Sequence, residues 1–277
     1  MSSRIVSIRP PDGSCRPTPF SESTASLILS SLTQILPTRY NRAMAPIISR
    51  PAVYCLIFVS IVAAVGCGPP STEETTQPVV PLPTANTDTP RVVFFGDSLS
   101  AGLGLAENEA FPAVTGELLR AAGVEIEVVN AGVSGDTSAG GLARLDWVLG
   151  QGADVLVVEL GGNDGLRGWS LENTESNLRR IVQRGLDIGA SVLLLGMDIP
   201  TNYGPDYTTA FAEMYRKIAD DEGATLVPGF IREVGMDPSL MQPDGIHPTA
   251  EGHRRLAETL RPYLEDTLSD LSDSGTS

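Results

Sequence analysis

From Arg91 onward, short apolar runs alternate with longer amphipathic stretches along the chain. The pattern predicts strands at 92–95, 124–129, 154–160, 191–195 and 224–227, and helices at 110–122, 138–149, 171–188, 206–222 and 249–264. Strands separated by helices of this length pair in parallel through right-handed crossovers. Runs such as 155–158 are apolar on both faces, as expected for strands that helices cover on each side. We therefore predict one α/β domain over 91–265, followed by a disordered Ser/Asp-rich tail at 266–277.

The apolar stretch 52–66 carries no charge, follows Arg50 and ends just before Cys67. At about 15 residues it is short for a membrane span, which needs roughly 20. A basic start, an apolar middle and small residues at the end are typical of a secretory signal. We predict a signal peptide at 44–67. Its end resembles a bacterial lipoprotein signal, which makes Cys67 a candidate for lipid attachment. Ordinary cleavage near Cys67 and an uncleaved membrane anchor remain as alternatives to lipid attachment.

The segments on either side of this signal have little pattern of their own. Residues 1–43 are rich in Ser, Pro and Arg, and Met44 lies directly before the signal. We expect 1–43 to be an extension that is disordered or wrongly included, with Met1 and Met44 both open as the translation start. Residues 68–90 are rich in Pro and Thr, which is the composition of an extended linker.

Charge and cysteine content exclude several classes of function. Residues 1–66 hold six arginines and two acidic residues, so the net charge of −15 leaves −19 for the remainder. An acidic body of this kind argues against nucleic-acid binding and against electrostatic docking on anionic lipid. No cysteine follows Cys67, and the chain has only two histidines. We therefore expect no disulfide, no thiolate nucleophile and no metal site in the domain.

Three polar residues in loops of the predicted domain have the chemistry of a serine hydrolase. Ser98 follows the first strand, and Asp244 and His247 lie in the loop before the last helix. Because sites in parallel sheets gather at the carboxyl ends of the strands, these residues are expected to meet. They would supply nucleophile, orienting acid and base. The alternative is that Ser98 and Asp244 only cap helices or turns. The other histidine, His253, is expected at a solvated surface position.

Two glycine-rich loops could provide hydrogen-bond donors to a developing oxyanion. Gly135 lies in the loop after the second strand, and Asn163 in the loop after the third. Together with the Ser98 N–H, they offer two backbone amides and one side-chain amide. A tight turn is the alternative role of each loop. Phosphate-binding glycine motifs do not occur in the chain, so nucleotide binding is not expected.

Five segments together resemble the SGNH/GDSL hydrolase superfamily, and specifically its thioesterase I, lysophospholipase L1 and arylesterase branch. They are GDSLSAGLG (96–104), NAGVSGDTSAGGLARL (130–145), VELGGNDGLRG (158–168), NYG (202–204) and MQPDGIHP (241–248). The resemblance implies a three-layer α/β/α sandwich of flavodoxin-like type, with a five-stranded parallel sheet. It makes Ser98, Gly135, Asn163 and His247 the four residues that name the superfamily, and Asp244 the third member of the triad.

The same resemblance implies a serine esterase that hydrolyses carboxylic esters and thioesters through an acyl-enzyme on Ser98, without a metal or organic cofactor. Leu166, Trp169, Met197 and Tyr203 are candidate substrate contacts, with plain packing as the alternative. A carbohydrate O-acetylesterase and a catalytically silent, acyl-binding lipoprotein are the alternative functions. We expect a small acyl ester or thioester as the only partner besides a membrane tether at Cys67, a monomer, and a periplasmic or membrane-anchored location in a bacterium.

Overall fold

The computed structural model describes residues 6–7 and 89–274 of the chain. Its centre is a parallel sheet with the strand order β1-β3-β2-β4-β5-β6. The strands are β1 (Val6–Ser7), β2 (Arg91–Gly96), β3 (Glu127–Asn130), β4 (Val155–Glu159), β5 (Ser191–Leu195) and β6 (Thr225–Val227). Strands β2 to β6 are the five that the sequence predicts, in the flavodoxin-like order.

The two-residue strand β1 extends the sheet at the β3 edge. Val6 pairs with Val129, and Ser7 with Asn130. For these two residues the structure differs from the expected disordered extension, because the exposed edge of β3 offers backbone groups to pair with. The rest of 1–43, the predicted signal at 44–67 and nearly all of the linker lie outside the described residues.

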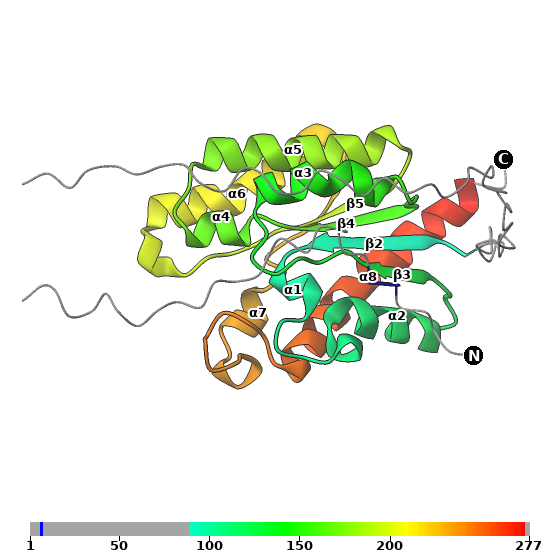
Figure 1. Ribbon diagram of the computed structural model, residues 1–277, viewed down its shortest axis with the longest axis horizontal. Coiled ribbons are helices and arrows are strands. Elements are labelled where there is room, and N and C mark those ends of the chain that lie inside the picture. Colours follow the sequence, from blue (N-terminus) through cyan, green and yellow to red (C-terminus); the bar gives the residue numbers. More distant parts are fainter. Residues whose placement is uncertain (1–5, 8–88, 275–277) are drawn as a thin grey trace, which may run out of the picture. The chain divides into compact units, whose positions relative to one another are not determined.

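Helices cover both faces of the sheet, as Figure 1 shows. They are α2 (Phe111–Ala121) and α8 (Ala250–Ser274) on one face, and α3 (Ser138–Leu149), α5 (Leu171–Asp187) and α6 (Pro205–Glu222) on the other. Strand β4 is buried at every position, which is the burial that its apolar sequence predicts. The predicted α/β fold with helices on both sides of a parallel sheet is confirmed.

Short elements that the periodicity could not reveal connect the strands to the long helices. They are α1 (Ser98–Ala101), α4 (Gly162–Leu166), α7 (Arg232–Gly235), η1 (Glu107–Glu109), η2 (Thr201–Tyr203) and η3 (Pro238–Leu240). None is longer than five residues, so none completes the two turns over which a helical pattern becomes visible. No helix within residues 89–274 combines the length and the hydropathy that a membrane crossing requires.

The C-terminal helix corrects the predicted tail at 266–277. Helix α8 continues to Ser274, ten residues beyond the predicted helix end at 264. Leu264 and Leu268 are buried, and both belong to the hydrophobic core, four residues apart on one face of the helix. Among the Ser and Asp residues that suggested disorder, those at 269, 270, 272 and 273 are exposed. Residues 275–277 lie outside the described residues.

Candidate active site

Ser98, His247 and Asp244 meet at the carboxyl edge of the sheet. The His247 Nε2 atom lies 2.9 Å from Ser98 Oγ, and the Asp244 Oδ2 atom lies 2.7 Å from His247 Nδ1. Ser98 is the first residue of α1, directly after β2, and is 8 % exposed. This contact joins residues 149 positions apart in the sequence. The spatial convergence on which the sequence interpretation depends is therefore present.

Asp244 is held in place by its own loop. Its Oδ1 atom accepts hydrogen bonds from the N–H groups of Ile246 and His247, at 2.9 and 3.0 Å. These amides and the His247 side chain lower the pKa of Asp244 to about 2. The carboxylate is therefore ionised at neutral pH, and its Oδ2 atom accepts a hydrogen bond from the Nδ1–H of the imidazole. That fixes the tautomer of His247 with its Nε2 lone pair towards Ser98.

Backbone hydrogen bonds join the two ends of the loop that carries Asp244 and His247. Met241 and Pro248 form an isolated antiparallel bridge, and the Gln242 N–H donates to the His247 carbonyl at 2.7 Å. The Gln242 side chain links the loop to the neighbouring turn, because its Nε2 atom donates to the carbonyls of Leu103 and Pro248, each at 2.8 Å. Leu103 follows α1, so this glutamine connects the histidine loop to the serine turn.

The opposite side of the site presents amide donors. Asn163, the second residue of α4, donates from Nδ2 to Asp97 Oδ2 at 2.8 Å, and Asp97 directly precedes Ser98. Gly135 has a φ of 81°, a left-handed conformation that suits glycine. Within residues 89–274, the Ser98 and Gly135 N–H groups have no acceptor, whereas the amides of Asp97, Leu99 and Ser100 are all paired. N–H groups that make no hydrogen bond within the protein are available to bind an oxyanion.

Arg144 of α3 holds the loop that contains Gly135. Its Nε atom donates to Asp136 at 2.7 Å, and its two terminal nitrogens donate to the carbonyls of Ala131 and Gly96 at 2.8 and 3.0 Å. The guanidinium also stacks over the Phe95 ring, 4.2 Å from the ring centre. One side chain thus joins the end of β2, the start of the loop and the residue after Gly135.

The family model of the GDSL-like Lipase/Acylhydrolase family matches residues 94–255, which is more than half of the chain. The chain belongs to this family. The match begins in β2 and ends in α8, so it contains Ser98, Gly135, Asn163, Asp244 and His247. As a member of the family, the protein is a hydrolase of the GDSL type, and the predicted family resemblance is confirmed.

Individual relatives agree with the family. The chain is 47 % identical to "Esterase TesA" of Pseudomonas aeruginosa over 174 residues, which are 62 % of this chain and 87 % of that protein. It is 41 % identical to "Thioesterase 1/protease 1/lysophospholipase L1" of Escherichia coli (strain K12), over 64 % of this chain and 85 % of that protein. Among solved structures, the psychrotrophic esterase EstA from Pseudoalteromonas sp. shares 32 % identity with a TM-score of 0.62, covering 65 % of this chain and 98 % of that one.

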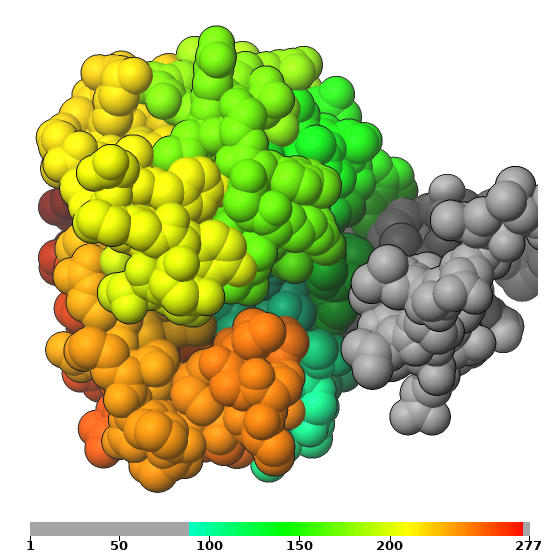
Figure 2. Space-filling view, turned by 90° about the vertical axis from the view of Figure 1, so that its left-hand side faces the viewer, coloured from blue at the N-terminus to red at the C-terminus, as the bar shows by residue number. Residues whose placement is uncertain are grey.

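The site of this GDSL hydrolase lies in an open hollow. Figure 2 looks onto the carboxyl edge of the sheet and shows a depression between the yellow to green residues above and the orange residues below, with the teal chain near α1 at its floor. The upper wall contains α4 and the start of α6, and the lower wall contains the loop of Asp244 and His247. The turn that carries Ser98 therefore lies at the floor of a hollow that is open to solvent.

The four predicted substrate contacts differ in their exposure. Trp169 is 48 % exposed, and Arg167 lies over its ring at 5.2 Å from the ring centre. Tyr203 is half-buried and donates from its hydroxyl to the Leu166 carbonyl at 2.6 Å, so these two residues hold the upper wall together. Met197 is only 4 % exposed and belongs to the hydrophobic core, which makes packing its role in this conformation.

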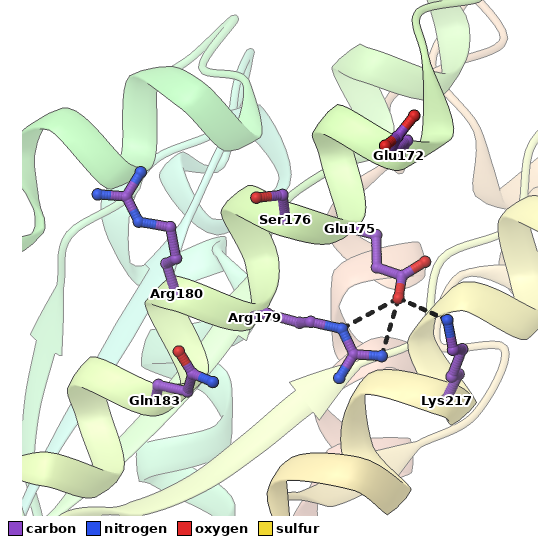
Figure 3. A pocket seen from close by; sticks show the side chains of 7 residues that line it. All are labelled: Glu172, Glu175, Ser176, Arg179, Arg180, Gln183 and Lys217. Atoms are coloured by element: carbon purple, nitrogen blue, oxygen red, sulfur yellow. Dashed lines mark hydrogen bonds and ion pairs between the residues drawn. The ribbon is translucent and has the colours of Figure 1, made fainter.

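A second hollow lies on the outer face of α5, away from the triad. Figure 3 shows its lining side chains, among which Glu175 accepts hydrogen bonds from Arg179 and Lys217. Its volume is about 460 Å³. Arg179 also donates to Glu222 and Asp221, so Arg179 and Lys217 are paired with carboxylates. Its lining holds no nucleophile beside a base, and we do not assign the hydrolase chemistry to it.

His253 corrects the prediction of a solvated surface histidine. The residue is 1 % exposed, its Nδ1 atom accepts the Phe111 N–H at 3.1 Å, and its ring stacks on Phe111. Phe111 begins α2, whose first N–H groups have no partner within the helix, and the imidazole satisfies one of them. The surrounding charged residues of α8 suggested exposure, but His253 faces the core. The preference for His247 as the base does not depend on this point.

The sequence interpretation missed two side chains that bind the serine turn from below. Asn130 at the end of β3 donates to the Ser100 carbonyl at 2.7 Å and accepts the Gly132 N–H at 3.0 Å. Glu159 at the end of β4 accepts hydrogen bonds from Asp97 and Ser100. One signal was available: an acidic residue that ends an otherwise apolar strand is rarely buried without a reason.

Proposed function

We propose that the protein is a serine esterase that hydrolyses carboxylic esters and thioesters through an acyl-enzyme on Ser98. The observation that carries this proposal is the chain of two contacts from Asp244 through His247 to Ser98 Oγ, at 2.7 and 2.9 Å. A serine hydroxyl is a weak nucleophile until a base accepts its proton, and this geometry provides the base in the required tautomer. The names of the relatives as esterase and thioesterase support the same reaction.

The reaction then proceeds in two steps. His247 takes the Ser98 proton while the hydroxyl oxygen attacks the carbonyl carbon, and the oxyanion lies between the Ser98 and Gly135 N–H groups and the Asn163 amide. His247 returns the proton to the alcohol or thiol that leaves. A water molecule then attacks the acyl-enzyme with the same base, releasing the acid and the free serine. The three donors act where charge develops, which is the interaction that accelerates the chemical step.

The substrate is proposed to be a small acyl ester or thioester whose acyl part lies in the groove near Trp169. The hollow that Figure 2 shows is open to solvent, and we expect the acyl group to enter there beside the upper wall. Trp169 and Leu166 are the exposed and half-buried apolar residues there, with Tyr203 holding Leu166 in place. Trp169, the more exposed of these two residues, is expected to affect acyl-chain preference rather than the chemical step.

The export of the enzyme is part of the proposal. The apolar run 52–66 after Arg50 supports cleavage of a signal before or near Cys67, and lipidation of Cys67 would tether the domain through the 68–90 linker. The mature N-terminus, analysed by mass spectrometry of protein from a bacterial expression host, tests this directly. A lipidated Cys67 supports the tether, and an unprocessed Met1 or Met44 start contradicts export.

A fluorophosphonate probe on the full-length protein tests the reaction. We expect covalent labelling of Ser98, identified by peptide mass spectrometry, and loss of both labelling and p-nitrophenyl butyrate turnover in Ser98→Ala. Turnover by Ser98→Ala at the wild-type rate would refute the assignment.

A panel of acyl-CoA, lysophospholipid, aryl ester and acetylated sugar then separates the substrate classes. Acetate release from the sugar without activity on longer esters would instead indicate an O-acetylesterase, and binding without labelling a silent acyl-binding protein.

A further inference from the structure

A buried carboxyl group lies directly beneath the nucleophile turn. Glu159 ends β4 with no exposed surface, and it pairs in register with Gly96 of β2, two residues before Ser98. The other residues of the strand are apolar. Within the described residues no lysine, arginine or histidine pairs with Glu159, so nothing compensates a charge there. A buried group of this kind needs a structural reason.

The contacts of Glu159 are directed at the residues on either side of Ser98. Its Oε2 atom accepts the N–H groups of Asp97 and Ser100, each at 3.1 Å, and the Ser100 hydroxyl at 2.8 Å. The carboxyl fills the space next to Gly96, where a Cβ atom would overlap both Glu159 Oε2 and Ser100 Oγ. The amides flanking Ser98 are thus turned inward, and the Ser98 N–H is left for the oxyanion.

A second carboxyl group adjoins the first and holds an oxyanion donor. Asp97 is 3 % exposed, and its two oxygens accept the Leu99 N–H at 3.1 Å and the Asn163 amide at 2.8 Å. The other oxygen of Glu159, Oε1, is buried and has no partner among the described residues. Two carboxyl groups are thus buried side by side. One oxygen of Glu159 accepts three hydrogen bonds, and the two oxygens of Asp97 accept one each.

The electrostatics of this pair favour one proton and one negative charge. Burial raises the pKa of Glu159 well above its usual range, and the charge of Asp97 raises it further. Burial also raises the pKa of Asp97, to about 6, although hydrogen bonds from the Leu99 N–H and the Asn163 amide lower it. The other ionisable groups facing the pair are Tyr215 of α6, Arg144 of α3 and His247. Arg144 and His247 act on Asp97, so the negative charge resides there.

We propose that Glu159 is a positioning residue of the esterase reaction, which as a neutral acid fixes the serine turn through Asp97 and Ser100 and leaves Asp97 as the single carboxylate that orients the Asn163 amide. The proton sits on Oε1, the oxygen without a donor. An ionised Glu159 would add a second negative charge near the oxyanion and oppose the transition state. This role deepens the proposed function and rests on it.

Replacement by glutamine and by alanine separates the neutral-acid role from a general packing role. In Glu159→Gln, the amide oxygen accepts the three donors and the NH₂ group replaces the O–H. We expect full-length Glu159→Gln to keep kcat on p-nitrophenyl butyrate within about threefold, with the acid limb of its pH profile unchanged. Glu159→Ala is expected to lower kcat by about 10²-fold with little change in KM, as for the loss of one oxyanion donor.

Several results would overturn the proposal. One is an acid limb that moves down by a pH unit or more in Glu159→Gln, because removing a real negative charge would lower the pKa of the ionisable groups near it. Another is a loss of kcat in Glu159→Gln as large as in Glu159→Ala, and a third is wild-type kcat in Glu159→Ala. If the alanine variant does not fold, the pH profile of the glutamine variant decides alone.

A spectroscopic measurement distinguishes this proposal from the proposed function itself. At pH 8, the wild-type protein should show an infrared band of a protonated carboxyl group, and Glu159→Gln should lack it. This band does not depend on turnover. Its presence in a protein that fluorophosphonate fails to label would refute the esterase function and keep the neutral Glu159. Its absence in an active wild-type enzyme would refute the neutral acid and keep the esterase.

Discussion

The two histidines of the chain lie six positions apart and perform opposite tasks. His247 sits in an exposed loop, where its Nδ1 atom faces the Asp244 carboxylate and must carry a proton. His253 sits in the core, where its Nδ1 atom accepts the Phe111 N–H and must not carry one. In each of the two histidines a single partner fixes the tautomer of the ring, and the two tautomers are opposite. The difference shows that the group bonded to the Nδ1 atom decides whether an imidazole is available as a base.

The surroundings reinforce the contrast. A carboxylate beside His247 stabilises the positive charge that the ring acquires during the reaction. Burial around His253 opposes that charge and lowers its pKa to about 4, with a smaller contribution from nearby His247. The His247 ring therefore has a carboxylate to balance a positive charge, whereas His253 stays neutral through the physiological range. The four predictions that follow test this contrast, beginning with the largest effect.

Replacing His247 should remove the chemistry and leave the fold intact. We expect His247→Ala to lower kcat/KM on p-nitrophenyl butyrate by on the order of 10⁵-fold, since the base and the nucleophile act as one unit. The free energy of unfolding, measured with urea at pH 8, should change by no more than about 0.5 kcal/mol because the loop is at the surface. His253→Gln, with near wild-type kcat/KM, is the matched control. Equal losses in both variants would contradict the division of tasks.

Replacing Asp244 by asparagine should separate the closure of the loop from the orientation of the ring. The asparagine oxygen can still accept the Ile246 and His247 N–H groups, but its NH₂ group cannot accept the Nδ1–H of the imidazole. We expect kcat to fall by about 10⁴-fold through the wrong tautomer. Circular dichroism should show an unchanged fold. A kcat within tenfold of wild type would mean that the carboxylate does not fix the tautomer.

His253 should make stability depend on pH. Because its pKa is lowered to about 4 in the folded state, the unfolded chain takes up a proton first as pH falls below about 6.5. Stability is therefore full above pH 6.5 and is lost progressively down to about pH 4, by at most about 3 kcal/mol. Urea unfolding at pH 7, 6, 5 and 4 measures this.

The matched variant for that experiment is His253→Gln, which keeps an acceptor for the Phe111 N–H but cannot titrate. Subtracting its pH dependence from that of the wild-type protein isolates the histidine from the many carboxylates. A difference that stays constant between pH 7 and pH 4 would show that the ring is not held neutral.

The smallest effect is expected at the link between the histidine loop and the serine turn. Gln242→Ala removes the hydrogen bonds to the Leu103 and Pro248 carbonyls, worth about 1–2 kcal/mol of stability together. We expect a few-fold decrease in kcat, because Asp244 and the loop backbone still orient the ring. Measuring kcat at two temperatures, and comparing the ratio of the two values with the wild-type ratio, tests whether the loop is held less firmly. A loss approaching that of Asp244→Asn would show that loop position, and not the tautomer, dominates.

Strong local patterns were predictable from the sequence, and weak ones were not. The predicted helix at 138–149 and strand at 191–195 agree with α3 and β5 at both ends, because caps and apolar runs define them. Helix α1 has only four residues, which is too short for a periodic signal. The extension of α8 was missed because its Ser and Asp residues dominate the composition, although Leu264 and Leu268 keep the helical spacing.

Some residues of the candidate site could likewise be predicted from the sequence, and others could not. Ser98, Gly135, Asn163, Asp244 and His247 could be named because they end strands or lie in distinctive loops. Asp97, Asn130, Arg144 and Glu159 could not be assigned roles, because each acts through a partner far away in the sequence. The misplacement of His253 has the same origin, since the acceptor role of its ring depends on the start of α2, 142 positions earlier.

The sequence by itself determined the alternation of strands and helices, the order of the chemical groups and the family, because these depend on local periodicity and on residue type at fixed spacing. The tertiary structure alone decided which atoms face each other: that His247 reaches Ser98, that His253 supports a helix start, and that Glu159 lies under the Ser98 turn. Hydrogen bonds and burial act over ångströms in space, and distance along the chain carries no information about them until the sheet has formed.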